Sequence, residues 1–301
     1  MRQKHGINRI LALAAVTALS FMLGSCNSVA VIDGKAVSLE ELAASVEDMD
    51  EFRAQITVAE PEATGKLAFE GDGAVVDASN AGLGYVMIKR ASPTKRQKVR
   101  VTFNNDVIYD YDLAGDGQYA VYPLQSGSGA YNVRVLEQVE GDTYAVVHAC
   151  EFTADMASEN SPFLYPNVYV DYDKNSESVL ASQLICKDAP DDMEKAERLF
   201  GYVAYNTQYD TDKADNIRRG YIPDVDVTLR TQKGICFDYA SLLAAMLRAQ
   251  GIPARLVMGQ ASPENVLHAW NQAYINGNWV HMDPTFHDGR GPENYTVERI
   301  Y

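Results

Sequence analysis

The chain has 301 residues, of which 47% are hydrophobic and 22% charged, and its formal net charge is −15 at pH 7. That composition is typical of a folded globular protein with one or two domains. The excess of acidic residues argues against nucleic-acid binding, because phosphate contacts require clustered Lys and Arg.

The first 25 residues have the pattern of an export signal. Arg2, Lys4 and Arg9 precede a short apolar run over residues 10–23, as in a secretory signal peptide. The run ends in Leu-Gly-Ser-Cys, which resembles the lipobox of bacterial lipoproteins. The resemblance implies cleavage before Cys26, lipidation of its sulfur, and anchoring at the extracytoplasmic face of the cell membrane. An ordinary secretory signal and an uncleaved helix are the alternatives.

Residues 26–62 are expected to form a tether between this anchor and the folded part. Acidic residues are dense from Glu40 to Glu51, and the segment ends in Glu-Pro-Glu at 60–62. A short helix fits residues 39–52, but no apolar core is visible. The segment is therefore interpreted as a solvated spacer.

Residues 63–160 alternate between apolar and polar side chains with a period of two, which predicts strands. Strands are expected at 84–90, 98–103, 107–113, 118–124, 130–139 and 143–152. Short strands separated by Gly, Asn and Asp turns predict an antiparallel β-sandwich of the immunoglobulin-like kind. No cluster of catalytic residue types occurs here, and His148 is interpreted as structural, so a spacer or binding module is expected.

The last part of the chain, residues 176–301, predicts a helical domain with a small sheet. Helices are expected at 177–186, from the Asp191 cap to about 209, and from Asp224 to just before Gly234. A strongly apolar helix then starts at Cys236 and is stopped by Gly251. A thiol in the first turn of a helix lies at the positive end of its dipole, which favours the reactive thiolate.

A β-hairpin downstream brings the partners of a cysteine nucleophile together. Asn276-Gly277 between two apolar runs is a strong signal for a two-residue turn. That turn pairs Ile275 with Asn278, so that Asp283 falls opposite Trp270 and diagonal to His268 on the same face. A slip of one residue would break this arrangement. With a longer turn, His281 would replace His268.

Cys236, His268 and Asp283 are therefore the candidate catalytic residues. Cys236 would supply the thiolate, His268 would take and return a proton, and Asp283 would orient the imidazole and stabilise its charged form. The backbone N–H of Cys236 and one further donor would hold the oxyanion. Trp270 is expected to pack beside the histidine and shield it.

Three motifs carry a family resemblance. Gly-Ile-Cys-Phe-Asp-Tyr-Ala at 234–240, His-Ala-Trp at 268–270 and Asp-Pro-Thr at 283–285 resemble the transglutaminase-like superfamily, in the family's order. The resemblance implies an α+β fold with a papain-like core, in which the cysteine helix packs on an antiparallel sheet behind the β-sandwich. It implies the same three catalytic residues, and it suggests Tyr209 as the oxyanion donor, although a core tyrosine explains that residue equally well.

The resemblance implies a thiol enzyme, a peptidase, amidase or amine transferase acting on proteins or peptides, including cell-wall peptides, and using no cofactor. The alternative of a different class is a non-catalytic binding or scaffolding lipoprotein. Two weaker alternatives are a zinc site and an acetyl-coenzyme A transferase. Cys, His and Asp here lack the usual spacing of zinc ligands, and an exported protein has poor access to coenzyme A. No metal is therefore expected.

Three cysteines remain once Cys26 is assigned to the lipid anchor. At least one of them must be free. Cys150 and Cys186 can form a disulfide in an exported protein, but the sequence does not place them within reach of each other. Two separately buried thiols are the favoured alternative.

Overall fold

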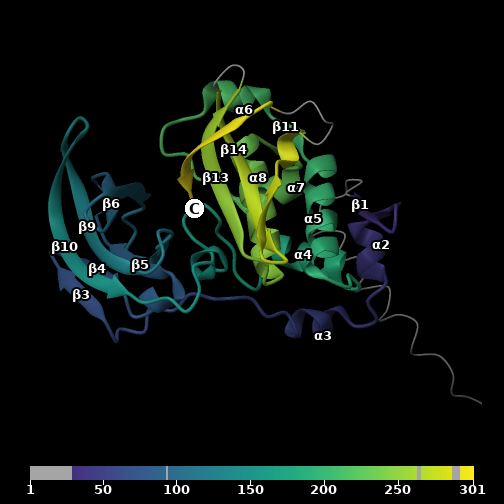
Figure 1. The fold of residues 1–301 in the computed structure, drawn as a ribbon, viewed down its shortest axis with the longest axis horizontal. Helices are drawn as coiled ribbons and strands as arrows, with labels where there is room; N and C mark the ends of the chain where they lie inside the picture. The colour runs from purple at the N-terminus through teal and green to yellow at the C-terminus, as the bar shows by residue number, and fades with distance from the viewer. Residues whose placement is uncertain (1–28, 93, 263–265, 287–291) are drawn as a thin grey trace, which may run out of the picture.

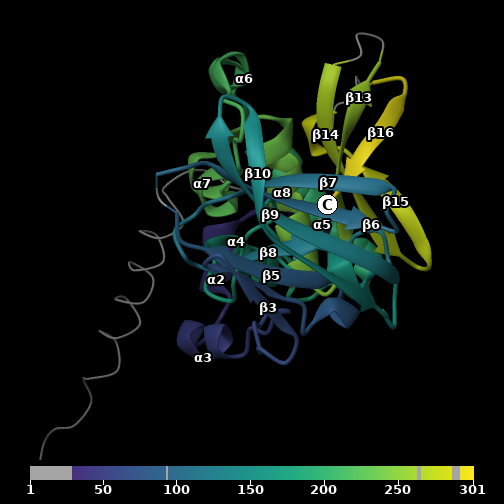
Figure 2. The ribbon, with the colours of Figure 1, turned by 90° about the vertical axis from the view of Figure 1, so that its left-hand side faces the viewer.

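The computed structural model describes residues 29–92, 94–262, 266–286 and 292–301. An all-β region lies beside a mixed α/β domain (Figure 1), and Figure 2 shows the molecule from the all-β side. The expected signal segment and Cys26 lie outside the described residues. Within the described ranges, no helix is both long enough and apolar enough to span a membrane.

The all-β region consists of two four-stranded antiparallel sheets with the strand orders β3-β4-β5-β8 and β10-β9-β6-β7. Their core is built from alternate residues, such as Val99 and Val101 of β6 and Val133 and Val135 of β9, all 0% exposed. The antiparallel sandwich is confirmed, and its immunoglobulin-like assignment stays a prediction. The strands are β3 (Ala68–Gly71), β4 (Ala74–Asp77), β5 (Tyr85–Arg90), β6 (Gln97–Phe103), β7 (Val107–Leu113), β8 (Ala120–Pro123), β9 (Gly129–Glu140) and β10 (Thr143–Ala154).

The expected tether is wrong for residues 29–56, which are folded. They form a hairpin, β1 (Val29–Ile32) and β2 (Lys35–Ser38), and two short helices, α2 (Leu39–Ala44) and α3 (Met49–Ala54). The hairpin contacts α5 (Asp192–Asn206) and α2 contacts α4 (Glu177–Cys186). The hairpin and α2 therefore cover the α/β domain on the side away from the sandwich (Figure 1). Its apolar residues, including buried Ala43, form a small cluster with Leu180 and Leu184. Burial of this face outweighs the acidity of the segment.

The α/β domain combines the helices α4 to α8 with the sheet β15-β14-β13-β16. Helix α8 contacts β13 and β14 on one side and α4, α5 and α7 on others, so it lies at the centre of the domain. The elements are α4 (Glu177–Cys186), α5 (Asp192–Asn206), β11 (Gln208–Tyr209), α6 (Thr211–Asn216), α7 (Val225–Thr231), β12 (Lys233–Gly234), α8 (Cys236–Ala249), β13 (Ala254–Ala261), β14 (Val266–Ile275), β15 (Asn278–Met282) and β16 (Tyr295–Ile300).

Most of the expected elements of this domain are confirmed within a few residues, and four were missed. The missed elements are α6, the two-residue pair β11 and β12, and the edge strand β16. Strand β16 pairs with β13, where Gly259 permits the contact because an added Cβ would lie 1.9 Å from the Thr296 carbonyl oxygen. A glycine inside a strand marks such a close backbone approach, and Gly259 was the available signal for a neighbouring strand.

Candidate active site

Cys236 is the first residue of α8 and is partly exposed, whereas nearly every later residue of this helix is buried. The preceding residues Lys233–Gly234 form β12, which pairs in parallel with β11 and fixes the entry to the helix. The first N–H groups of a helix have no partner within it, and together with the helix dipole they favour a negative charge beside them. The fold therefore places the Cys236 sulfur at the end of the helix where a negative charge is stabilised.

The hairpin register expected from Asn276-Gly277 is confirmed. Ile275 pairs with Asn278, and Asn271 with Met282, at the end of the β14–β15 ladder. Asp283 follows β15 directly, and its Oδ2 lies 2.7 Å from Nε2 of His268. Both residues are buried: His268 is 6% exposed and Asp283 is 7% exposed. A two-residue turn is therefore sufficient to bring the Asp283 carboxylate within hydrogen-bonding distance of the His268 imidazole.

The surroundings of His268 favour its charged form. Burial alone would lower the pKa of His268, but hydrogen bonds with Asp283 and with Cys236 outweigh burial and raise that pKa to about 9. Since Nε2 is bonded to Asp283, Nδ1 is left to face the thiol. The histidine thus lies between the sulfur and the carboxylate, as a cysteine–histidine–acid relay requires.

Asp283 has two further hydrogen bonds that sequence reasoning missed. The Tyr295 hydroxyl donates to Oδ2 over 2.8 Å, and the Thr285 backbone N–H donates to Oδ1 over 3.1 Å. Tyr295 is on the missed strand β16, whose position depends on the close approach at Gly259. Burial, followed by the charge of Asp283, raises the pKa of Tyr295, so the phenol stays protonated and acts as a donor.

Aromatic rings surround the imidazole. The Trp270 ring is stacked on it with 6.1 Å between centroids, and Phe286 lies at 5.2 Å. Trp270 is 1% exposed, and the expectation that it packs beside the histidine is confirmed. Apolar walls of this kind exclude water and strengthen the electrostatic interactions of the pair.

His281, the alternative base, is placed differently. It pairs with Gln272 in the ladder, and its ring packs against Tyr295 at 4.5 Å. Burial lowers the pKa of His281. The oxygen that would hold a catalytic histidine, Oδ2 of Asp283, is bonded to His268 instead.

Tyr209 lies next to the cysteine. It ends β11 and pairs with Gly234, two residues before Cys236. Its side chain is 42% exposed, so it is not a core tyrosine. Burial of its hydroxyl and then the neighbouring Cys236 raise the pKa of Tyr209, and a protonated phenol is a hydrogen-bond donor. Its role as oxyanion donor stays a prediction.

The other two cysteines are free, and the favoured alternative of separately buried thiols is confirmed. Cys150 is in the sandwich and Cys186 ends α4, and burial raises the pKa of each to about 12. Among the residues that the structure describes, no group of three or more His, Cys, Asp or Glu is arranged to hold a metal ion.

Comparison with known proteins agrees with this geometry. Residues 180–284 match the family model of the transglutaminase-like superfamily. Kyphoscoliosis peptidase of Mus musculus is 29% identical over 126 residues, covering 38% of this chain and 19% of the relative. The Homo sapiens protein of that name is 30% identical over 120 residues, covering 36% and 18%. The chain thus spans about a fifth of the length of these relatives.

A solved structure of a proposed cysteine protease from Cytophaga hutchinsonii is similar to 78% of this chain and 73% of its own. Its sequence identity is 18% and its TM-score is 0.40.

Proposed function

Since residues 180–284 match the family model of the transglutaminase-like superfamily, we propose that this protein is a thiol enzyme that acts on amide bonds of proteins or peptides. The observation that carries the proposal is the buried, hydrogen-bonded pair of His268 and Asp283 beside Cys236 at the start of α8. A structural role alone would not require a charged histidine next to the one partly exposed thiol among the described residues.

The proposed reaction starts with the thiol proton of Cys236 already held on His268, whose charged form is favoured by its surroundings. The thiolate attacks the amide carbonyl carbon, and the resulting oxyanion is held by the backbone N–H of Cys236 and by the Tyr209 hydroxyl. The carbon–nitrogen bond then breaks as the His268 imidazolium gives its proton to the leaving amine, which leaves a thioester on Cys236. Asp283 keeps the imidazole oriented through both proton transfers.

The second half of the reaction depends on the acceptor. Water, deprotonated by His268, would release the acid and give a peptidase or amidase. A primary amine in the same position would give a new amide and a transferase. The name of the mammalian relatives supports hydrolysis, and amine transfer is the other outcome that the experiment below detects.

We propose that the enzyme is anchored outside the cytoplasm through a lipid on Cys26, after removal of residues 1–25. The basic start, the short apolar run and the Leu-Gly-Ser-Cys sequence support this proposal. Its substrates would then be exported proteins or cell-wall peptides, and residues 29–56 would lead from the anchor directly onto the α/β domain.

The test is labelling with iodoacetamide at neutral pH, followed by mass spectrometry. Cys236 should be alkylated in the native protein, and Cys236→Ser should lose both this label and all turnover. Cys150→Ser and Cys186→Ser are matched controls and should keep both. Incubation with a glutamine-containing peptide and a labelled primary amine then separates cleavage from amine incorporation. A native Cys236 no more reactive than a free cysteine would overturn the proposal and favour a scaffolding lipoprotein.

A further inference from the structure

A buried carboxylate closes the first turn of the helix that carries Cys236. Asp238 is 0% exposed, and it accepts hydrogen bonds from the Ile235 backbone N–H at 2.8 Å, the Lys213 ammonium at 2.7 Å and the Tyr221 hydroxyl at 2.5 Å. Gly234 makes room for it, because an added Cβ would lie 2.5 Å from the Asp238 Cβ. Asp238 is two residues from the thiol, so its bonds fix the turn on which the sulfur sits.

Tyr221 joins this carboxylate to a loop. Its hydroxyl donates to Asp238 and accepts a bond from Lys213 at 2.6 Å, while the Lys213 ammonium lies 4.4 Å from the centre of its ring. The ring also packs edge-on against Phe237, at 6.4 Å. Tyr221 lies between α6 and α7, outside any helix or strand. Its position therefore depends on these side-chain contacts and on what the loop rests on.

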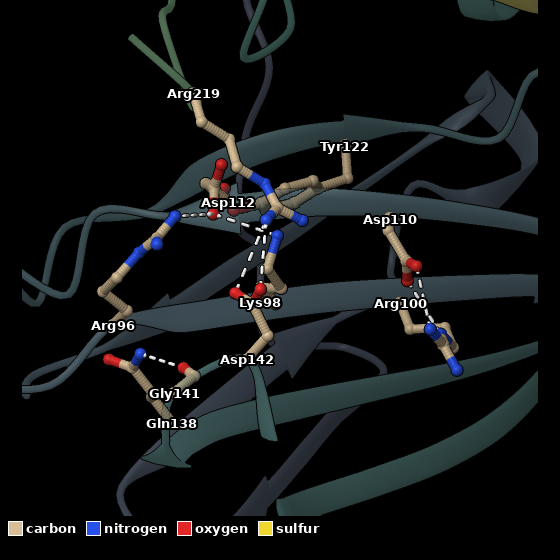
Figure 3. A network of polar contacts seen from close by, with 10 residues as sticks. All are labelled: Arg96, Lys98, Arg100, Asp110, Asp112, Tyr122, Gln138, Gly141, Asp142 and Arg219. Atoms are coloured by element: carbon tan, nitrogen blue, oxygen red, sulfur yellow. Dashed lines mark hydrogen bonds and ion pairs between the residues drawn. The ribbon is translucent and has the colours of Figure 1, made fainter. Parts of the chain in front are cut away.

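The loop rests on the β-sandwich. Gly220 has φ +82°, and an added Cβ would lie 3.1 Å from Oδ2 of Asp112 on β7. Figure 3 shows Arg219 reaching over the sandwich strands towards Asp142, and the two side chains form an ion pair at 3.4 Å. Asp112 forms ion pairs with Arg96 at 3.8 Å and with Lys98 at 3.3 Å. The Arg219–Asp142 pair is exposed on both sides, so it contributes little. The close approach at Gly220 is the specific contact.

A second contact runs from the same strand to the same turn. Tyr111, next to Asp112 on β7, packs against Tyr169 with 5.8 Å between ring centroids. Tyr169 packs in turn against Phe237 at 5.6 Å. Two adjacent residues of β7 thus connect by separate contacts to the two residues that follow Cys236. Tyr111 connects to Phe237 through Tyr169, and Asp112 connects to Asp238 through the loop that carries Tyr221.

We propose that Tyr221 is a positioning residue that transmits the support of the β-sandwich to the nucleophile through Asp238. The sandwich would then be a working part of the active site and not an independent spacer or binding module. The charged and titratable groups around this turn include Lys213, Tyr221, Asp238, His268 and Tyr209, and beyond them Asp215, Asp224 and Asp283. Without the Tyr221 hydroxyl, the Asp238 charge is less satisfied and its turn is looser, and both effects disfavour a thiolate nearby. This inference rests on the proposed function.

The test is the rate of iodoacetamide alkylation of Cys236 in the full chain, measured from about pH 5 to about pH 10. Tyr221→Phe should slow alkylation at neutral pH about tenfold and move the pH profile of alkylation to higher pH. Tyr109→Phe is the matched control, because Tyr109 is also on β7 but bonds Ser126 in the sandwich. It should leave the rate and the pH profile unchanged.

A glycine pair tests the contribution of the sandwich. Gly220→Ala adds a Cβ against Asp112 and should slow alkylation, and Asp112→Ala in the same chain should restore part of the rate. Gly117→Ala is the control for backbone strain, because Gly117 has the same φ of +82° but an added Cβ would meet only ordinary contacts. Gly220→Ala behaving like Gly117→Ala would overturn the coupling to the sandwich.

The outcomes separate the two proposals. A native Cys236 that is unreactive contradicts the proposed thiol enzyme itself. A reactive native Cys236 with the same pH profile in Tyr221→Phe overturns only the positioning role, even if Tyr221→Phe lowers the melting temperature.

Discussion

The β-sandwich and the α/β domain are both built on antiparallel sheets, but the α/β domain buries more of its charged side chains. Asp77 is the buried charged residue among the described residues of the sandwich, at 3% exposure. In the sandwich, the ion pairs Arg90–Glu137 and Arg100–Asp110 lie at the surface or close to it. In the α/β domain, His268, Asp283, Asp238 and Arg248 are all less than 9% exposed. Burying charge is costly. Three of these four groups, His268, Asp283 and Asp238, lie around Cys236, which marks that part of the domain as the candidate functional site.

The largest effect is expected at the base of the proposed reaction. His268→Ala should lower the neutral-pH alkylation rate of Cys236, and any turnover, by about 100-fold or more, the range for loss of a general base. His281→Ala is the matched control, because His281 lies on the same hairpin without the bond to Asp283. Equal losses in the two variants would contradict the assignment of His268.

Arg248 distinguishes structural burial of charge from catalytic burial. It is 1% exposed and donates to the backbone carbonyls of Ala254, Tyr165 and Tyr301. Burial lowers its pKa to about 10. Arg248→Met orphans these carbonyls and should cost about 4 kcal/mol of unfolding free energy.

Urea unfolding at neutral pH measures this cost. Arg255→Met is the control, because Arg255 packs between the rings of Phe163 and Trp279 and is partly exposed. Its loss should cost about 1 kcal/mol. If the two variants lose similar amounts of unfolding free energy, the buried hydrogen bonds of Arg248 do not stabilise the fold more than the packing of Arg255 does.

The two regions should also lose stability at opposite ends of the pH scale. Hydrogen bonds from Lys95 and Arg90 lower the pKa of Glu137 to about 2 from 4.5, so its contribution is present above 4.5 and lost as the pH falls towards 2. The pKa of His268 is raised from 6.5 to about 9, so its contribution is present below 6.5 and lost as the pH rises through 9. That shift corresponds to about 3 kcal/mol as an upper bound.

Both tryptophans of the chain, Trp270 and Trp279, are in the α/β domain, so their fluorescence follows unfolding of that domain. His268→Asn should flatten the alkaline loss of stability, and Glu137→Gln should flatten the acid loss seen by circular dichroism. An alkaline loss of the same size in His268→Asn would show that another group is responsible.

The same comparison shows what the sequence could predict. Local signals were sufficient for the β14–β15 hairpin, because the turn Asn276-Gly277 alone fixes which residues face each other. They were also sufficient for α8, which starts after Gly234 and ends before Gly251. Predicting Cys236, His268 and Asp283 as the triad required only these local features and the order of the motifs.

Contacts between distant segments were not predictable. The segment 29–56 consists of short elements whose apolar residues gain a partner only when Leu180 and Leu184 are placed beside them. The support of the Cys236 turn depends on a loop glycine, Gly220, meeting Asp112 in another domain. No periodicity or spacing in the sequence predicts these contacts, because neither partner carries a local signal that points to the other.

The substitution Tyr295→Phe has the smallest expected effect and is the most selective test of the buried pair His268 and Asp283. The hydroxyl of Tyr295 donates to the same Asp283 oxygen that holds His268, while its ring packs on His281 and Trp270. Tyr295→Phe keeps the ring and removes one hydrogen bond to a carboxylate, worth about 1 to 2 kcal/mol. Turnover should fall by about five- to thirtyfold, with little change in melting temperature, because the packing is preserved.

The variant Tyr274→Phe serves as the control, because Tyr274 is on β14 but packs against Trp279, away from the triad. If Tyr295→Phe and Tyr274→Phe have the same turnover, the bond from Tyr295 does not position Asp283. If only Tyr295→Phe is slower, an edge strand with no catalytic motif holds the acid in place. The site then depends on contacts from β16 as well as on the three motif residues.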